Sequence, residues 1–225
     1  MYWFMALAVV LAVVETLTQK GWNISRQNIY DGIRDVYWPG RFEIVSKDPL
    51  FIIDGGHNPQ CMESLAENIR SYLPGRGLTA LVGVMADKDY MDMFSMVAPY
   101  ITRFVTVTPD NPRALPAAEL AKALEIFGKP TTVCETVEEG VRTAITQTPQ
   151  EEAVVAFGSL YMLGTIREEM AQAELKKTIP AGMTKADYAE YKFNSALIEE
   201  DDFDMLIMGR TQGKGCYCYV NGVLK

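Results

Sequence analysis

From residue 40 onward, the hydrophobic positions of the chain change their period repeatedly. Short unbroken apolar runs alternate with segments whose apolar residues recur every four positions, as Leu65, Ile69 and Leu73 do. The first pattern is typical of strands buried on both faces, and the second is typical of amphipathic helices. Strands are predicted at 42–46, 49–54, 79–85, 103–108, 130–135 and 152–159. Helices are predicted at 60–73, 90–101, 115–128, 137–147 and 161–175.

This alternation predicts five strand–loop–helix units and therefore a mostly parallel sheet with helices on both faces. Ligands of such sheets bind in crevices beyond the carboxyl ends of the strands. Polar residues gather directly after four of the predicted strands, at 54–58, 86–89, 109–114 and 158–161. A binding site is expected where these segments meet.

The single histidine of the chain, His57, lies in one of these polar segments, three residues after Asp54. A structural interpretation makes His57 a capping residue in a tight turn and gives Asp54 bonds to N–H groups of the loop. A functional interpretation makes both side chains part of a site. The spacing alone does not choose between them.

The first seventeen residues, MYWFMALAVVLAVVETL, are apolar up to Glu15. This run is shorter than the ~20 residues that a membrane span needs, and it lacks the basic start of a signal peptide. We expect a buried helix, and because it is apolar all round, other protein has to cover it. Because this helix opens the chain, we expect that its covering layer is missing from this sequence.

The charge balance argues against two classes of partner. The chain has 21 basic and 29 acidic residues, a net charge of −8, and no basic patch, so neither nucleic acid nor an anionic membrane is expected to bind. The four cysteines are unevenly spaced, which is not the pattern of a disulfide framework and favours a reducing cytoplasm.

Five motifs occur in order on the predicted elements: VYWPGRFEIV (36–45), DGGHNP (54–59), GVMADKDY (83–90), NPRAL (111–115) and AFGSLYMLG (156–164). Together they resemble the C-terminal domain of folylpolyglutamate synthase/dihydrofolate synthase, a relative of the Mur peptide ligases, over residues of about 5–172. The resemblance implies a Rossmann-like fold and an ATP-dependent ligation. In that family ATP activates a carboxylate of folate or dihydropteroate as an acyl phosphate, which the amine of L-glutamate attacks.

The resemblance also implies roles for individual residues. Arg41 is similar to the arginine that reaches the nucleotide phosphates, and Asp54 to the aspartate that accepts hydrogen bonds from the ribose hydroxyls. His57 resembles the catalytic histidine that aligns nucleotide and glutamate. Lys88 and Ser159 resemble residues that hold the incoming glutamate, although Lys88 could equally be a solvated loop residue and Ser159 a helix N-cap. Gly56 departs from the alanine that is common in the family.

The family's phosphate loop, its Mg²⁺ ligands and most of its folate site lie in a preceding ATPase domain. Residues 1–37 resemble only the last helix and linker of that domain, and residues 38–172 resemble the C-terminal domain. We therefore expect this chain to need the missing phosphate-loop domain as a partner and to be inactive in ligation by itself.

The tail, residues 173–225, is expected to be a short foreign appendage. Its GRTQGKGC segment is not a phosphate loop, because three residues rather than four separate Gly209 from Gly213, and Lys214 is followed by a glycine and Cys216, with no Ser or Thr to bind Mg²⁺. From about residue 176 the tail resembles an internal piece of the MinD-like ATPase that matures carbon monoxide dehydrogenase and acetyl-CoA synthase. A natural fusion, an assembly artefact and an engineered joining all remain open.

Cys216 and Cys218 of the tail match a Cys-x-Cys pair that can bind metal across a dimer in the MinD-like family. Two thiolates do not complete the tetrahedral shell of zinc, so two chains would have to share the ion. An alternative function from another class therefore stays open: the protein is a non-catalytic binding module, or a metal-handling accessory protein that acts through the tail. A third candidate, a Mur-type UDP-sugar peptide ligase, is disfavoured by WPGRFEIV and DGGHNP.

Two structural predictions follow from these interpretations. Arg41, Asp54 and His57 should converge at the carboxyl end of the sheet, with Asp54 at the end of a central strand and His57 in the loop after it. The tail should pack poorly or be extended, and the strand that begins at Phe203 should invite pairing with another chain.

Overall fold

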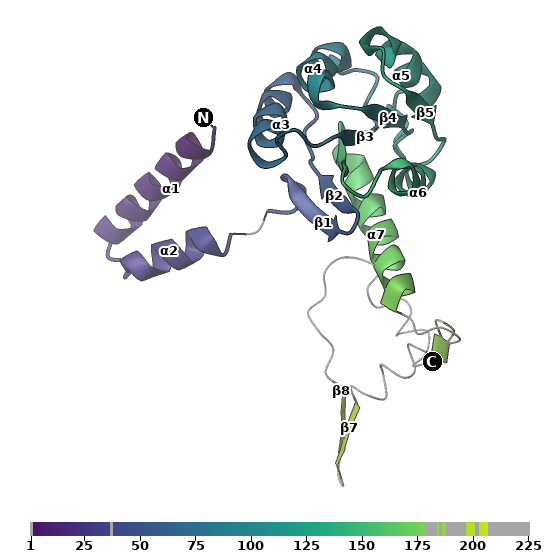
Figure 1. The fold of residues 1–225 in the computed structure, drawn as a ribbon. Helices are drawn as coiled ribbons and strands as arrows, with labels where there is room; N and C mark the ends of the chain where they lie inside the picture. Colours follow the sequence, from purple (N-terminus) through teal and green to yellow (C-terminus); the bar gives the residue numbers. More distant parts are fainter. Residues whose placement is uncertain are drawn as a thin grey trace. The chain divides into compact units, whose positions relative to one another are not determined.

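The computed structural model describes residues 2–36, 38–178, 184, 186–187, 197–200 and 203–206. The chain divides into two units, Met1–Met170 and Ala171–Lys225. The helices of the first unit are α1 (Tyr2–Gln19), α2 (Arg26–Arg34), α3 (Pro59–Tyr72), α4 (Tyr90–Val97), α5 (Ala117–Leu124), α6 (Val137–Gln147) and the start of α7 (Leu163–Thr178). Figure 1 shows these helices with the sheet that five of them cover.

Six strands form one sheet in the order β1-β2-β6-β3-β4-β5. They are β1 (Glu43–Lys47), β2 (Leu50–Ile53), β3 (Leu78–Val82), β4 (Arg103–Thr106), β5 (Thr131–Val133) and β6 (Ala153–Phe157). The edge strand β1 is antiparallel to β2, and all other pairs are parallel. The predicted α/β fold with a mostly parallel sheet is therefore confirmed.

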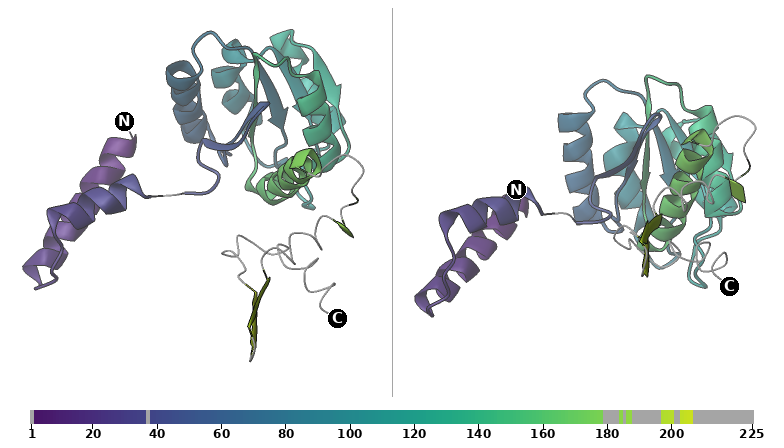
Figure 2. Two further views of the ribbon diagram at one scale, coloured as in Figure 1. Left: turned by 60° about the horizontal axis from the view of Figure 1, so that its bottom comes forward. Right: turned by 90° about the horizontal axis from the view of Figure 1, so that it is seen from below.

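The central strands are apolar along their whole length because helices cover both faces of the sheet. Every residue of β3 and β6 is buried. One face packs against α3, α4 and α5 around Phe94, whose ring contacts Phe104 and Phe157. The other face packs against α6 and α7, with Val141 and Ile166 in its core. The two layers of helices can be followed in Figures 1 and 2.

Local signals in the sequence account for several helix ends. Asn58 caps α3 by accepting a hydrogen bond from the Cys61 N–H at 2.9 Å, and Pro59 occupies the first turn, where its missing N–H costs nothing. The predicted helix at 115–128 is α5 followed by the short 3-10 helix η2 (Glu125–Phe127). It ends as expected at Gly128, which has a left-handed φ of 63°.

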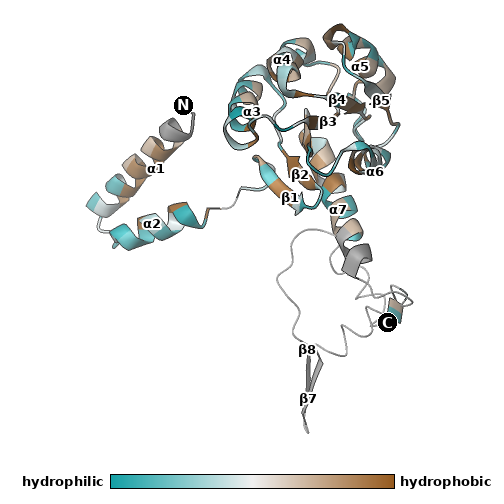
Figure 3. Ribbon diagram, in the orientation of Figure 1, coloured by the Kyte–Doolittle hydropathy of each residue, from teal (hydrophilic) through white to brown (hydrophobic). Residues whose placement is uncertain are grey.

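The expected burial of the first helix is not found within the described chain. Of the described side chains between residues 6 and 19, only Val14 and Leu17 are partly covered, and the rest are exposed. Figure 3 shows α1 as mostly hydrophobic and α2 as mostly hydrophilic. Further protein that would cover α1 stays a prediction. Within the described residues, no helix combines the length and the apolar character that crossing a membrane requires.

In the second unit, β7 (Leu197–Glu200) and β8 (Phe203–Leu206) form an antiparallel pair in which Leu197 faces Leu206. The predicted strand beginning at Phe203 therefore exists, and β7 is its partner. Thr184 and Asp187 are joined by hydrogen bonds in both directions. The remaining expectations for the tail, including its proposed dimerisation, concern residues that lie mostly outside the described ranges.

Candidate functional site

The strand order places a topological switch point at the carboxyl end of β6. The neighbouring strands β2 and β3 are followed by α3 and α4, which cover one face, whereas β6 is followed by α7 on the other face. The loops after these three strands therefore lead to helices on opposite faces, and open α/β sheets bind ligands beyond the strand ends at such a point. Asp54 follows β2, Ser159 follows β6 and Lys88 follows β3, so this one edge carries three of the predicted site residues.

Asp54 anchors the loop after β2 to a segment that lies earlier in the chain. Its Oδ2 accepts a hydrogen bond from the Phe42 N–H at 2.9 Å, and its Oδ1 accepts one from the Gly56 N–H at 2.7 Å. A third contact joins the same two segments, because the Gly55 N–H donates to the Gly40 carbonyl at 2.7 Å. The structural interpretation of Asp54, in which its carboxylate accepts hydrogen bonds from loop N–H groups, is thus confirmed. A ligand-binding role for Asp54 stays a proposal.

Gly40, Arg41 and Phe42, here called the arginine segment, have an unusual backbone. Gly40 has a φ of 74° and Phe42 a φ of 45°, and left-handed backbone is unfavourable for a residue with a side chain. A Cβ at Gly40 would also lie 2.5 Å from Leu163 Cδ1. The Phe42 ring lies 5.9 Å from that of Tyr72. Glycine adopts such a φ readily, so it is Phe42 that packing and hydrogen bonds hold in an unfavourable backbone conformation.

The environment of Asp54 opposes its ionisation. Its side chain is buried, and burial raises the pKa of its carboxyl above the ordinary value, while the Gly56 and Phe42 N–H groups and the charge of Arg41 act in the opposite direction. The desolvation of a carboxylate is the larger effect, although each of these three partners favours the charged form. The Asp54 carboxyl and the Arg41 guanidinium are therefore electrostatically coupled.

The Arg41 side chain is exposed and lies over the first turn of α3. Its Nη1 is 4.0 Å from the Sγ of Cys61, the third residue of that helix. No ion pair of Arg41 occurs within the described part of the chain. An exposed guanidinium beside the positive end of a helix dipole favours an anionic ligand.

His57 lies in the loop after Asp54, half-buried, with its Nδ1 2.8 Å from the Gly55 carbonyl oxygen. A carbonyl oxygen can only accept a hydrogen bond, so Nδ1 carries the proton and donates it. In the neutral ring this leaves Nε2 without a proton. The fold thus selects a tautomer whose Nε2 can accept a hydrogen bond or a proton from a ligand.

The segments that carry Arg41, Asp54 and His57 meet at the carboxyl end of the parallel sheet, as the sequence predicted. Asp54 directly follows β2, an inner strand between β1 and β6. Its carboxylate and the Gly55 N–H bring the arginine segment to the same loop. The arrangement that would have removed the predicted site, with Arg41 and Asp54 on opposite faces, is absent from this part of the structure.

Lys88 is half-exposed in the loop between β3 and α4. Its Nζ is 4.0 Å from Asp87 Oδ2, and the same oxygen is 3.4 Å from Arg113 Nη1. The loops that carry Lys88 and Arg113 are joined by the backbone, because the Ala86 N–H donates to the Arg113 carbonyl at 2.9 Å. Two cations therefore share one exposed carboxylate, Asp87, in these two loops.

Ser159 is buried and caps a short 3-10 helix, η3 (Leu160–Met162), since its Oγ accepts a hydrogen bond from the Tyr161 N–H at 3.2 Å. The N-cap alternative is thus confirmed as its structural role. Gly158, just before it, donates to the Gly56 carbonyl at 2.9 Å. This bond holds the loop after β6 against the loop that carries His57.

Sequence reasoning missed two charged residues next to the site, Glu43 and Arg167, which form an ion pair between β1 and α7. Glu43 lies inside the quoted WPGRFEIV motif, but no pattern indicates that its carboxylate turns back toward Gly40. Arg167 is far away in the sequence, and nothing in the sequence of a helix identifies the strand it will contact. Both were detectable only from the folded chain.

The predicted metal-binding cysteines, Cys216 and Cys218, lie outside the described residues. Within the described residues, no group of three or more His, Cys, Asp or Glu side chains is arranged to hold a metal ion.

Comparison with known proteins places this domain among ligases. The family model described as "Mur ligase, glutamate ligase domain" matches residues 40–160, more than half of the chain. A folylpolyglutamate synthase of Lacticaseibacillus casei is 32% identical over 167 residues, which cover 74% of this chain and 37% of that enzyme.

Solved structures show the same relationship. The folylpolyglutamate synthase of Mycobacterium tuberculosis in complex with ADP superposes with a TM-score of 0.64 at 25% identity, covering 72% of this chain and 38% of that one. This chain therefore spans less than two fifths of either enzyme. A separate similarity, 48% identical over 63 residues, is to an uncharacterized ATP-binding protein of Methanocaldococcus jannaschii, and it covers 28% of this chain and 25% of that protein.

Proposed function

The chain belongs to the Mur ligase family through its glutamate ligase domain, and from that premise we propose that it is the nucleotide- and glutamate-contacting part of a folylpolyglutamate synthase/dihydrofolate synthase. The complete enzyme would add L-glutamate to a carboxylate of folate or dihydropteroate in a reducing cytoplasm. ATP would first convert that carboxylate into an acyl phosphate, and the amine of L-glutamate would then displace the phosphate. The similarity to folylpolyglutamate synthases supports this substrate class.

One observation carries the proposal: the fold brings Arg41, Asp54 and His57 together at the switch point through the bonds between the arginine segment and the loop after β2. The exposed guanidinium of Arg41 would bind phosphate oxygens of ATP, which match its planar set of donors. Each Asp54 oxygen has two acceptor positions and uses one for a backbone N–H. The remaining capacity would serve the ribose hydroxyls.

His57 would align the nucleotide and the incoming amino acid. Its bare Nε2 can accept a proton from the ammonium group of L-glutamate, whose nitrogen must lose a proton before it attacks the acyl phosphate. Lys88 would hold a carboxylate of L-glutamate as a compact charge. Ser159 already uses its hydroxyl oxygen as a cap, so its contribution to glutamate binding would come from the O–H as a donor.

The chain would not complete this reaction alone. Phosphoryl transfer requires a loop that cradles the phosphates and Mg²⁺ that offsets their charge, and the GRTQGKGC segment lacks the spacing and the hydroxyl of such a loop. We assign residues 1–37 to the end of a central ATPase domain, residues 38–172 to the glutamate ligase domain and residues 173–225 to an appended fragment. A phosphate-loop domain supplied separately would provide the missing parts.

Calorimetric titration with ATP, followed by a glutamate-ligation assay, tests this proposal. Two or three charge-assisted hydrogen bonds set against the entropy of association should give an ATP dissociation constant of about 1 mM or weaker. No ligation is expected until a separately produced ATPase domain of the family is added. Micromolar ATP affinity, or turnover by the lone chain, would contradict the proposed division of labour.

The tail is assigned on resemblance alone to the MinD-like maturation ATPase. A zinc ion shared by Cys216 and Cys218 of two chains would be compatible with that assignment and with the tetrahedral shell of zinc. Metal analysis of the separated monomer and dimer tests it. The zinc content should follow the dimer fraction and disappear in Cys216→Ser, whereas one ion per monomer that survives this substitution would exclude the shared site.

A further inference from the structure

Glu43 contacts the residue on the amino side of Arg41. It lies at the start of β1, and its Oε2 accepts a hydrogen bond from the Gly40 N–H at 2.6 Å. The same oxygen pairs with Nη2 of Arg167 on α7. The Glu43 side chain is only 13% exposed and that of Arg167 35%, so solvent screens this pair less than a surface ion pair.

The pair connects the arginine segment to a well-packed helix. Arg167 follows Ile166, which is fully buried in the second core face, and Met170 lies in the same face one turn later. A Cβ on Gly40 would lie 2.5 Å from Cδ1 of Leu163, at the start of α7. Figure 1 shows the first turns of α7 beside β1 and β2. The Glu43 carboxylate is therefore held by a rigid element rather than by a loop.

Two carboxylates consequently fix the backbone on both sides of Arg41. Glu43 binds the N–H of Gly40, and Asp54 binds the N–H of Phe42. A long, exposed side chain can place its charged end accurately only when its own backbone is fixed, because each loose torsion multiplies the positions it can reach. Neither carboxylate needs to touch a ligand to have this effect.

We propose that Glu43 is a positioning residue for Arg41, and that Arg167 holds Glu43 in place. The inference deepens the proposed function, because it rests on Arg41 as the group that binds the phosphates of ATP. It goes further in assigning a role at that site to β1 and α7, the two elements on either side of the arginine segment. The ion pair between Glu43 and Arg167 sets where the guanidinium of Arg41 lies, and the guanidinium of Arg41 contacts the phosphates of ATP.

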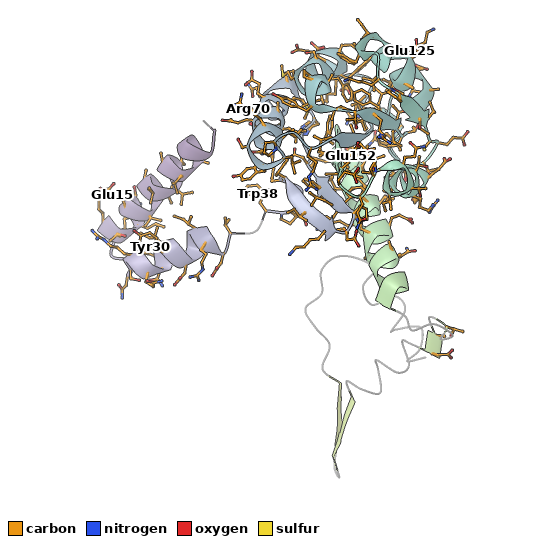
Figure 4. The ribbon with its side chains drawn as sticks, viewed as in Figure 1. Glu15, Tyr30, Trp38, Arg70, Glu125 and Glu152 are labelled. Carbon is orange, nitrogen blue, oxygen red and sulfur yellow. The ribbon has the colours of Figure 1, made fainter. Side chains whose placement is uncertain are left out.

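The first measurement examines the backbone and does not depend on ATP. The full chain is labelled with ¹⁵N, and hydrogen exchange of the Gly40 amide is compared between the parent protein and Glu43→Ala. We expect exchange to become at least about tenfold faster, since the buried N–H loses a charged acceptor. Glu125→Gln, on the η2 turn after α5 and well separated from β1 (Figure 4), is the control and should leave this amide unchanged.

The second measurement follows amide chemical shifts during titration with ATP. Arg41→Ala should weaken binding about tenfold, the loss expected for a charged hydrogen bond, and Glu43→Ala about threefold. In the double variant of Arg41→Ala and Glu43→Ala, the second substitution should cause no further loss of ATP affinity, because the Arg41 side chain that Glu43 positions is already absent. Glu43→Gln keeps an acceptor for Gly40 and should recover most of the affinity. Arg167→Ala, which removes the ion pair that holds Glu43, serves as the test variant if Glu43→Ala does not fold, and it should also weaken ATP binding.

The outcomes separate the two proposals. Unchanged Gly40 exchange in Glu43→Ala overturns the positioning role, and so does an equal loss of ATP affinity from Glu43→Ala with and without Arg41. If Arg41→Ala binds ATP as well as the parent protein, the proposed nucleotide role of Arg41 is wrong. The exchange of the Gly40 amide then decides by itself whether Glu43 orders the arginine segment.

Discussion

The carboxylate of Asp54 accepts a hydrogen bond from the backbone N–H of Phe42 at 2.9 Å, across twelve positions of the chain. This bond joins the end of β2 to the arginine segment that precedes β1. Because the carboxylate is buried, removal of either partner would leave a polar group without its bond in a dry environment, which is costly. This hydrogen bond therefore fixes the arginine segment to the end of β2 and supports the proposed site.

The buried position of Asp54 makes a prediction about pH. Burial raises its pKa above the ordinary 3.8, so the folded protein retains this proton to higher pH than the unfolded chain does. The contribution of Asp54 to stability is thus fully present below the ordinary pKa and is lost as the pH rises through the raised value. Urea denaturation at a series of pH values should show the parent protein losing stability relative to Asp54→Asn across this window.

The coupling of Asp54 to Arg41 supplies the control for that experiment. Arg41→Ala removes a charge that lowers the pKa of Asp54, so the carboxyl should titrate at still higher pH in this variant. The ¹³C shift of the Asp54 carboxyl reports its titration directly, and Asp110→Asn, at an exposed position, should not change it. A carboxyl that titrates below its ordinary range would show that hydrogen bonding outweighs desolvation here.

Gly40 should tolerate alanine poorly, for two separate reasons. Its φ of 74° is strained for a residue with a Cβ, and that Cβ would lie 2.5 Å from Leu163 Cδ1. Strain of about 1–2 kcal/mol should reduce the free energy of unfolding, and the contact should add a smaller cost, because the end of the half-buried Leu163 side chain can shift. Gly75→Ala is a matched control, because Gly75 has a φ of 69° with open space around it. Equal losses in the two variants would mean that the contact with Leu163 is unimportant.

His57 should exist as a single tautomer when its ring is neutral. The Gly55 carbonyl accepts from Nδ1, so the proton should be found on Nδ1 and not on Nε2. Long-range ¹H–¹⁵N NMR distinguishes the two ring nitrogens, and because the chain has one histidine, the assignment needs no comparison. A protonated Nε2 in the neutral ring would remove the proposed proton acceptor from the site.

The stability of the sheet should depend on its aromatic centre and not on α1. Phe94 is fully buried against Phe104 and Phe157, and Phe94→Ala should cost about 3–5 kcal/mol of unfolding free energy. Val10, in α1, is 48% exposed, so Val10→Ala should change stability by less than about 0.5 kcal/mol. Denaturant unfolding followed by far-UV circular dichroism measures both. A large loss from Val10→Ala would mean that α1 is covered in solution.

The elements of the sheet were predictable from local patterns, with small errors at their ends. Unbroken apolar runs such as those of β3 and β6 can be stable only where both faces are covered, and this requirement is already visible in the residues. The helix cap at Asn58 and the stop at Gly128 also act within a few positions. The location of Asp54 and His57 at a strand end followed from the same patterns.

What the sequence by itself determined was therefore the set of elements, the layered α/β fold and the residues at the carboxyl ends of the strands. The tertiary structure alone decided that Asp54 would hold the backbone after Arg41 through the N–H of Phe42, twelve positions away, and that Arg167 of α7 would reach Glu43 of β1. Local patterns arise from interactions between neighbours in the chain, whereas these contacts form only after the strands have paired and brought distant segments within hydrogen-bonding distance. The chemistry proposed here depends on contacts of the second kind, because the position of a charge is set by the groups that fold around it.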